Sequence, residues 1–122
     1  MDTRAVGEKL VALCKEGKNL DAVEQLYSPE IVSVEPQGMP DMPAEQRGLD
    51  AIRGKHRWWS ENNEVHSGTS EGPFVHGDKF AAIHAYDVTS KAGPNAGQRN
   101  NFREVAVYAV KDGKIVREEF YY

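Results

Sequence analysis

Hydrophobic residues recur at helical spacing in the first half of the chain. Within residues 4–15 they repeat as i, i+4, i+7 and i+8, at Val6, Leu10, Leu13 and Cys14. A shorter segment after it carries Tyr27 on its apolar side, and a third stripe within 49–62 includes His56 and Trp59. These patterns predict three helices, each with one face turned toward a core.

From residue 64 onward the spacing changes to the alternation that is typical of strands. Predicted strands lie at 31–35, 64–72, 74–76, 79–90, 99–110 and 114–121, with tight turns at Gly77-Asp78 and Asp112-Gly113. The segment 36–47, which contains three prolines, is predicted to be a loop at the mouth of a pocket. Helices first and strands last predict one α+β domain over residues 1–122, in which N-terminal helices pack in a curved antiparallel sheet.

The last hairpin predicts which side chains face inward. A two-residue turn at Asp112-Gly113 sets Lys111 opposite Lys114, and counting back sets Val107 opposite Glu118. Val107, Glu118 and Phe120 then share the more apolar face, which we expect to line the pocket.

The opposite face of this hairpin predicts self-association. Its residues include Glu104, Tyr108, Val110, Ile115 and Tyr121. Exposed apolar patches of this kind usually mark interfaces, so we expect a homodimer formed through the sheet.

Glu118 is the leading candidate for proton transfer. A carboxylate among apolar side chains loses solvation, which raises its pKa above the ~4.3 of free Glu. A general acid or base works best when its pKa lies near the ambient pH. The same side chain can instead form a structural ion pair with Arg103, which is predicted to lie on the same face.

Further residues are candidates for catalysis or ligand contact. Glu35 stands at the end of the first predicted strand, beside the proline-rich segment. His84 and Tyr86 share the bulkier face of their strand, and if that face points inward both can hydrogen-bond a ligand oxygen. If the other face points inward, Asp87 takes the acidic role. The remaining residues expected to line the pocket are Tyr27, His56 and Trp59.

Composition and charge narrow the function classes. There are 15 Lys and Arg against 19 Asp and Glu, with no basic cluster, which argues against nucleic acid and against an anionic membrane as partners. The four histidines have no short ligand spacing, and no glycine-rich phosphate loop is present, so we expect neither metal nor cofactor. Without a visible signal peptide or apolar span, a cytoplasmic location is expected.

Two segments resemble a known family. Residues 26–36, LYSPEIVSVEP, resemble the passage from helix to first strand in the SnoaL-like branch of the nuclear transport factor 2-like superfamily, and residues 107–118, VYAVKDGKIVRE, are similar to its last hairpin. The resemblance implies a cone-shaped α+β barrel, usually dimeric, whose open end admits a hydrophobic ligand. Members include ketosteroid isomerases, polyketide cyclases and limonene-epoxide hydrolase-like enzymes, so the fold alone does not fix the function.

Two classes of function fit these observations. The first is a cofactor-independent isomerase, cyclase or hydrolase that uses a pocket carboxylate and hydrogen-bond donors on a small hydrophobic molecule. The second is a non-catalytic ligand-binding or dimerisation module of the same fold. Convergence of Glu35, Glu118 and His56 on one cavity would favour the first class.

Overall fold

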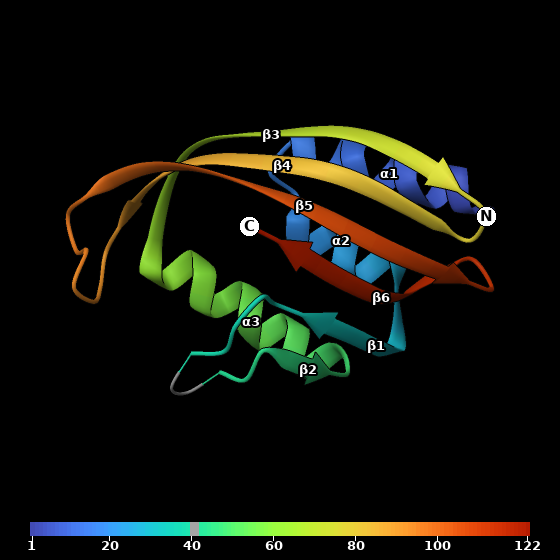
Figure 1. The fold of residues 1–122 in the computed structure, drawn as a ribbon, viewed down its shortest axis with the longest axis horizontal. Helices are drawn as coiled ribbons and strands as arrows, with labels where there is room; N and C mark the ends of the chain where they lie inside the picture. The colour runs from blue at the N-terminus through green and yellow to red at the C-terminus, as the bar shows by residue number, and fades with distance from the viewer. Residues whose placement is uncertain (40–41) are drawn as a thin grey trace.

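The computed structural model describes residues 1–39 and 42–122, which form three helices and six strands (Figure 1). The helices are α1 (Thr3–Lys15), α2 (Asn19–Leu26) and α3 (Leu49–Asn62). The strands are β1 (Tyr27–Val34), β2 (Glu45–Arg47), β3 (Asn63–His76), β4 (Lys79–Ser90), β5 (Arg99–Lys111) and β6 (Lys114–Tyr121). None of the described helices is long and apolar enough to cross a membrane.

The order of elements follows the sequence prediction, with three differences. The strands predicted at 64–72 and 74–76 form one strand, β3. β1 begins at Tyr27, although the sequence predicts a strand only from residue 31. β2 lies inside the segment 36–47, which the proline content predicts to be a loop. Residues 40 and 41 of that segment lie outside the described residues.

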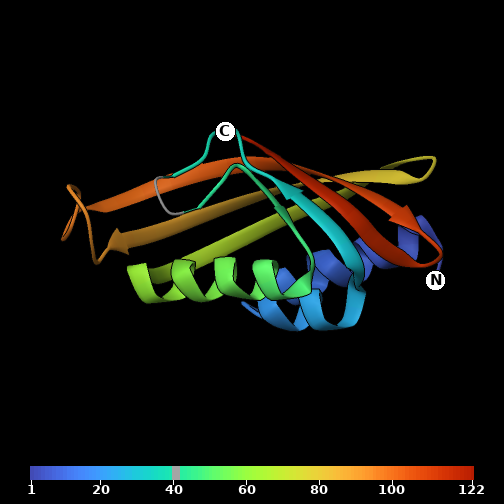
Figure 2. The ribbon, with the colours of Figure 1, turned by 90° about the horizontal axis from the view of Figure 1, so that it is seen from below.

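The strands form one open, mixed sheet in the order β2-β1-β6-β5-β4-β3. The α+β class is confirmed, but the expectation of a purely antiparallel sheet is wrong for one pair, because β1 runs parallel to β6. These two strands are far apart in the sequence, so no hairpin forces them to be antiparallel. Figure 2 shows the sheet curved over the helices, which all lie on its concave side.

The core lies where α1 and α2 pack on the concave face. Val6 and Leu10 of α1 and Phe80 of β4 are buried there. Gly7 permits the close approach of α1 to the sheet, since a Cβ at this position would lie 2.7 Å from Cβ of Pro73. Burial of this apolar surface is the main favourable contribution to folding.

A β-bulge in the last hairpin changes which residues face inward. The turn pairs Lys111 with Lys114 as predicted, but Ala109 then pairs with Arg117, which leaves Val116 as an extra residue on β6. A bulge of one residue reverses the alternation of one strand relative to its partner. Consequently Tyr108, and not Val107, is the partner of Glu118.

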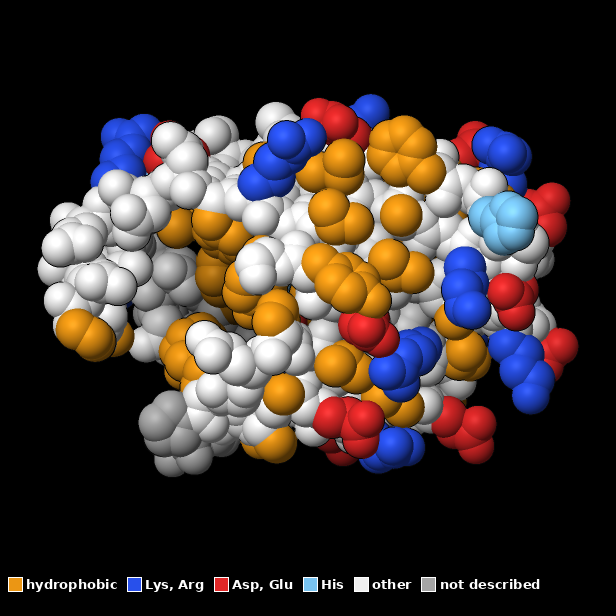
Figure 3. All heavy atoms as spheres, in the orientation of Figure 1, with side chains coloured by type: hydrophobic (Ala, Val, Ile, Leu, Met, Phe, Trp, Pro, Cys, Tyr) orange, Lys and Arg blue, Asp and Glu red, His pale blue; other side chains and the backbone are white. Residues whose placement is uncertain are grey.

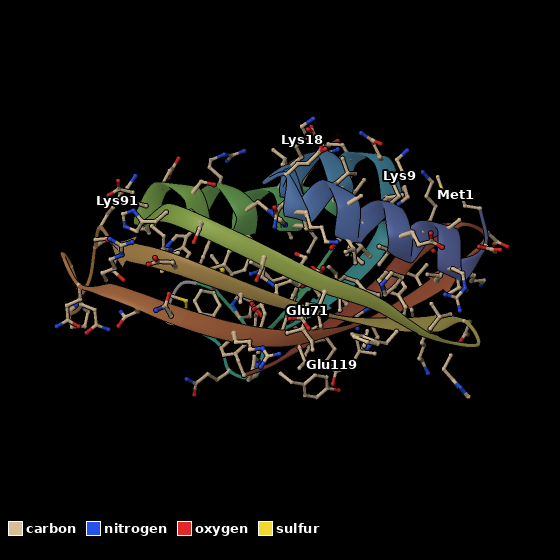
Figure 4. The ribbon with its side chains drawn as sticks, turned by 90° about the horizontal axis from the view of Figure 1, so that it is seen from above. Met1, Lys9, Lys18, Glu71, Lys91 and Glu119 are labelled. Atoms are coloured by element: carbon tan, nitrogen blue, oxygen red, sulfur yellow. The ribbon has the colours of Figure 1, made fainter. Side chains whose placement is uncertain are left out.

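The predicted faces of β5 are therefore exchanged. Tyr108, Val110 and Ile115, which the sequence places on the outer face, are buried in the core. Val107, which the sequence places in the pocket, lies on the outer face of the sheet beside Glu119. Figure 4 shows Glu119 on the side of the sheet turned away from the helices.

The outer face of the sheet nevertheless carries exposed apolar side chains. Val105 and Tyr121 are cross-strand neighbours there, with 38% and 52% of their surface exposed. Figure 3 shows hydrophobic side chains gathered over this face, with charged side chains among and around them.

Candidate functional site

A cavity of about 1190 Å³ lies between the helices and the concave face of the sheet. Figure 3 shows a hollow at the left side of the molecule with hydrophobic side chains in its wall. The cavity is lined by eight of the nine residues that the sequence predicts for the site: Glu118, Glu35, His84, Tyr27, His56, Trp59, Tyr86 and Phe120. Val107 is the ninth, and the bulge turns it away from the cavity.

Glu118 is held by hydrogen bonds on both carboxylate oxygens. The hydroxyl of Tyr27 donates to Oε1, and Oγ of Ser33 donates to Oε2 at 2.7 Å. Only 2% of the residue is exposed, and this burial raises the pKa of its carboxyl, against the opposing effects of Lys55 and of the two hydrogen bonds. Arg103, the alternative ion-pair partner, is exposed on the outer face.

Lys55 of α3 connects two of the cavity carboxylates: it contacts Glu35 directly and Glu118 through Ser33. Its Nζ donates to Oγ of Ser33 at 2.8 Å and lies 3.3 Å from Oε1 of Glu35. The ammonium also stands 4.8 Å from the centroid of the Phe120 ring, a cation–π geometry. The second oxygen of Glu35 is buried without a hydrogen-bond partner among the described residues, and burial raises the pKa of this carboxyl.

Glu104 is a third cavity carboxyl, although the sequence predicts that it lies on the outer face of the sheet. In the structure it pairs across strands with His84 and lines the cavity. Its pKa is raised to about 8, chiefly because the carboxyl is buried and secondarily because Glu35 and Glu118 carry negative charge nearby. Within the described part of the chain, no hydrogen bond stabilises the charged form of Glu104, and Lys55 only partly offsets the effect of burial.

The bulkier face of β4 points into the cavity. His84 of this face and His56 of α3 both line the cavity. Both are neutral at pH 7, because burial lowers the pKa of each imidazole to about 4. His84 uses both ring nitrogens, with Nδ1 2.8 Å from Oγ of Ser70 and Nε2 2.9 Å from the hydroxyl of Tyr108. Asp87 lies on the other face of β4, where it is paired with Arg99 at 2.8 Å.

Aromatic rings and methionines form the apolar part of the wall. Trp59 packs against Tyr86 and Phe102, with ring centroids 5.9 and 5.3 Å apart. Met39 and Met42, from the segment predicted to border the pocket, also line the cavity. Flexible methionine side chains adapt to irregular apolar ligands.

The groups in the cavity suit proton transfer. Among residues 1–39 and 42–122, no three His, Cys, Asp or Glu side chains are grouped so that they could hold a metal ion. The cavity instead combines one carboxyl that titrates near neutral pH with neutral hydroxyl and imidazole groups. A group with such a pKa can release and accept a proton at the pH of the cell.

Lys55 is predicted to hold the pKa of Glu104 down. Replacing Lys55 by Met keeps most of the apolar side chain and removes the positive charge, so the pKa of Glu104 should rise above about 8. A ¹³C NMR titration of the glutamate carboxyl carbons measures the change. Lys9→Met on the exposed side of α1 is the matched control and should leave the titration unchanged (Figure 4). An unaltered or lower pKa in Lys55→Met would show that the two groups are not coupled.

The chain is similar to a family model and to several solved structures. The family model described as "SnoaL-like domain" matches residues 1–122. A solved structure from Mesorhizobium loti, described as a proposed SnoaL-like polyketide cyclase and also as a carbohydrate phosphatase, is similar at 42% identity with a TM-score of 0.91. The similarity covers 100% of each of the two chains.

More distant structures share the fold. A proposed polyketide cyclase from Pseudomonas putida has 18% identity and a TM-score of 0.74 over 100% of this chain and 92% of that one. A proposed isomerase from Bacillus subtilis has 20% identity and a TM-score of 0.76, covering 99% and 88%. The comparison with curated proteins finds no match. Because the family model matches residues 1–122 of the chain, the chain belongs to the SnoaL-like domain family.

Proposed function

We propose that the chain is a cofactor-independent isomerase or cyclase that acts on a small apolar substrate by general acid–base chemistry. The observation that carries this proposal is the position of Glu104 in the cavity, without a hydrogen-bond partner in the described chain and with a pKa of about 8. At neutral pH such a carboxyl is present in both protonation states. It is therefore suited to take a proton from one atom of a substrate and return it to another.

Glu104 ranks above the two carboxyls that the sequence favours. Both oxygens of Glu118 accept hydrogen bonds, which favour the ionised carboxylate and so oppose the effect of burial. Glu35 lies beside Lys55, whose charge favours the ionised carboxylate and so opposes the effect of burial. In the proposed site, Glu118 and Glu35 act mainly by raising the pKa of Glu104.

The lining of the cavity bears on the class of substrate. Five carboxyl groups and four Lys or Arg side chains line it, and among the latter Lys55 contacts Glu35 and Ser33. An uncharged substrate with aromatic or alicyclic rings suits the apolar wall.

The experiment follows proton exchange on a probe ketone, 2-tetralone, in D₂O. If a cavity carboxyl abstracts protons from carbon next to a carbonyl, the wild-type protein should accelerate the loss of the corresponding ¹H NMR signals. Glu71→Gln, at an exposed position of β3, serves as a control with the same chemical change and should be as active as the wild type. Binding of the ketone, seen as a change in tryptophan fluorescence, without accelerated exchange would favour the alternative of a non-catalytic binding module.

We also propose a homodimer formed through the outer face of β5 and β6. The residues on which the sequence bases this expectation are buried, but Val105 and Tyr121 supply an exposed apolar surface in their place. Light scattering at micromolar concentration should give twice the mass of one chain, and Val105→Glu should give the mass of one. Leu20→Glu, at a position on α2 that is also exposed, should remain dimeric. A wild-type protein with the mass of one chain would refute the dimer.

A further inference from the structure

A chain of three polar side chains crosses the concave face of the sheet. Ser70 of β3 is the cross-strand partner of His84 of β4, and its Oγ lies 2.8 Å from Nδ1. Nε2 of the same imidazole lies 2.9 Å from the hydroxyl of Tyr108 of β5. All three residues are buried, so each polar atom needs a hydrogen-bond partner within the protein or the cavity.

A neutral imidazole carries one N–H and one lone pair, which leaves two possible arrangements. In the first, Ser70 donates to Nδ1 and the N–H on Nε2 donates to the Tyr108 hydroxyl oxygen. In the second, the N–H on Nδ1 donates to Ser70 and the Tyr108 hydroxyl donates to Nε2. The arrangements differ in which hydroxyl proton is left without an acceptor: that of Tyr108 in the first, that of Ser70 in the second.

The surroundings of the two hydroxyls distinguish between these arrangements. Ser70 does not line the cavity, and its hydroxyl contacts no other hydrogen-bonding side chain within the described residues. A free Ser70 proton would therefore be buried and unsatisfied, which is unfavourable. Tyr108 does line the cavity, so a ligand or water there can accept its proton. The first arrangement leaves no buried donor without access to an acceptor.

We propose that Tyr108 donates a hydrogen bond to an acceptor oxygen of the cavity ligand, such as a carbonyl, and that Ser70 and His84 are positioning residues which set the direction of this donor. The imidazole thus contacts the ligand only through Tyr108, whereas the sequence predicts a direct contact from His84. This inference rests on the proposed function of the cavity, because it names the group that binds the substrate oxygen while Glu104 moves the proton.

The packing around Tyr108 supports a fixed donor. Its ring stacks on Phe80 with centroids 4.7 Å apart and planes 17° from parallel. Glu104 lies on the same inward face of β5, and the hydroxyl of Tyr108 lies 2.9 Å from Nε2 of His84, the cross-strand partner of Glu104. A carbonyl compound bound with its oxygen at Tyr108 can therefore present a neighbouring C–H bond to Glu104. Donors placed in advance for a developing negative charge are among the largest contributors to catalysis.

The direction of the hydrogen bonds is measurable without a ligand. ¹⁵N NMR of the wild-type protein labelled at histidine should show His84 as the tautomer that carries its proton on Nε2. Ser70→Ala removes the donor to Nδ1 and should shift His84 toward a mixture of tautomers. Ser67→Ala, in the same strand but outside the hydrogen-bonded chain, should leave the tautomer unchanged. A proton on Nδ1 in the wild type would overturn the proposal.

The ligand contact is measured with 2-tetralone labelled with ¹³C at its carbonyl. Its infrared carbonyl band should move to lower frequency in the wild-type protein, lose this shift in Tyr108→Phe, and keep it in Tyr121→Phe, the same change on the outer face of the sheet. A carbonyl band that is unshifted in the wild type, or still shifted in Tyr108→Phe, would refute the donor role. Proton exchange is a separate readout, so the failure of Glu104 as a base would leave these two results intact.

Discussion

Replacing Glu104 by Gln is expected to lower kcat/KM by ~10²–10⁴-fold for any substrate whose conversion includes proton transfer in the cavity. The amide keeps nearly the same volume and suits a buried site better than a charged carboxylate, but it cannot carry a proton between atoms of the substrate. The proton-exchange rate on 2-tetralone is the first measurement, and steady-state kinetics follow once a substrate is identified. Folding of the variant should be intact, which near-UV circular dichroism verifies.

The pH dependence of kcat/KM tests whether Glu104 is the group that transfers the proton. If the carboxylate is the base, kcat/KM of the wild type should rise with pH and level off above about 8, because the ionised fraction of Glu104 rises over that range. This rise should be absent in Glu104→Gln and retained in Glu71→Gln. If Glu104→Gln keeps full activity while Glu118→Gln loses it, Glu118 is the proton-transferring group and the ranking proposed for the carboxyls is wrong.

Phe80→Ala is expected to destabilise the fold by ~3–5 kcal/mol. Phe80 is 1% exposed, stacks on Tyr108 and lies under α1 beside Gly7, so its removal leaves a cavity lined by a helix and a strand that cannot collapse into it. Domains are stable by only ~5–15 kcal/mol, so this is a large fraction of the total. The midpoint of urea unfolding measures the effect.

Phe74→Ala provides a matched control on the opposite side of the sheet. Phe74 lies on the edge strand β3 and is 56% exposed, so the same substitution there should change the free energy of unfolding by less than about 0.5 kcal/mol. Equal losses of stability at the two positions would mean that the inward and outward faces of the sheet are assigned incorrectly.

Local patterns in the sequence predict most of the fold. The helical stripes are continuous, so the three helices follow from periodicity, and the turn at Asp112-Gly113 fixes the end of the last hairpin. The parallel contact of β1 with β6 and the short strand β2 depend on contacts between distant residues. Periodicity within one segment carries no information about such contacts.

The candidate site is predicted less completely, and one residue accounts for the main error. Val116 bulges out of the ladder between β5 and β6, so counting back from the turn assigns the inward residues of β6 near Glu118 correctly and those of β5 incorrectly. For this reason the sequence analysis assigns Glu104 and Tyr108 to the outer face and Val107 to the pocket, and all three assignments are wrong. The pairing of β4 with β5, which sets Glu104 opposite His84, would have revealed the error. The turn between those strands is too long to give this register from sequence.

The most decisive single measurement is a ¹³C NMR titration of the Glu104 carboxyl carbon in the wild-type protein, with its signal assigned from the Glu104→Gln spectrum. Burial and the charges of Glu35 and Glu118 should place the midpoint near pH 8, far above the ordinary value of 4.5. A midpoint close to 4.5 would mean that the carboxyl is ionised and solvated throughout the physiological range, and would contradict its proposed role in proton transfer.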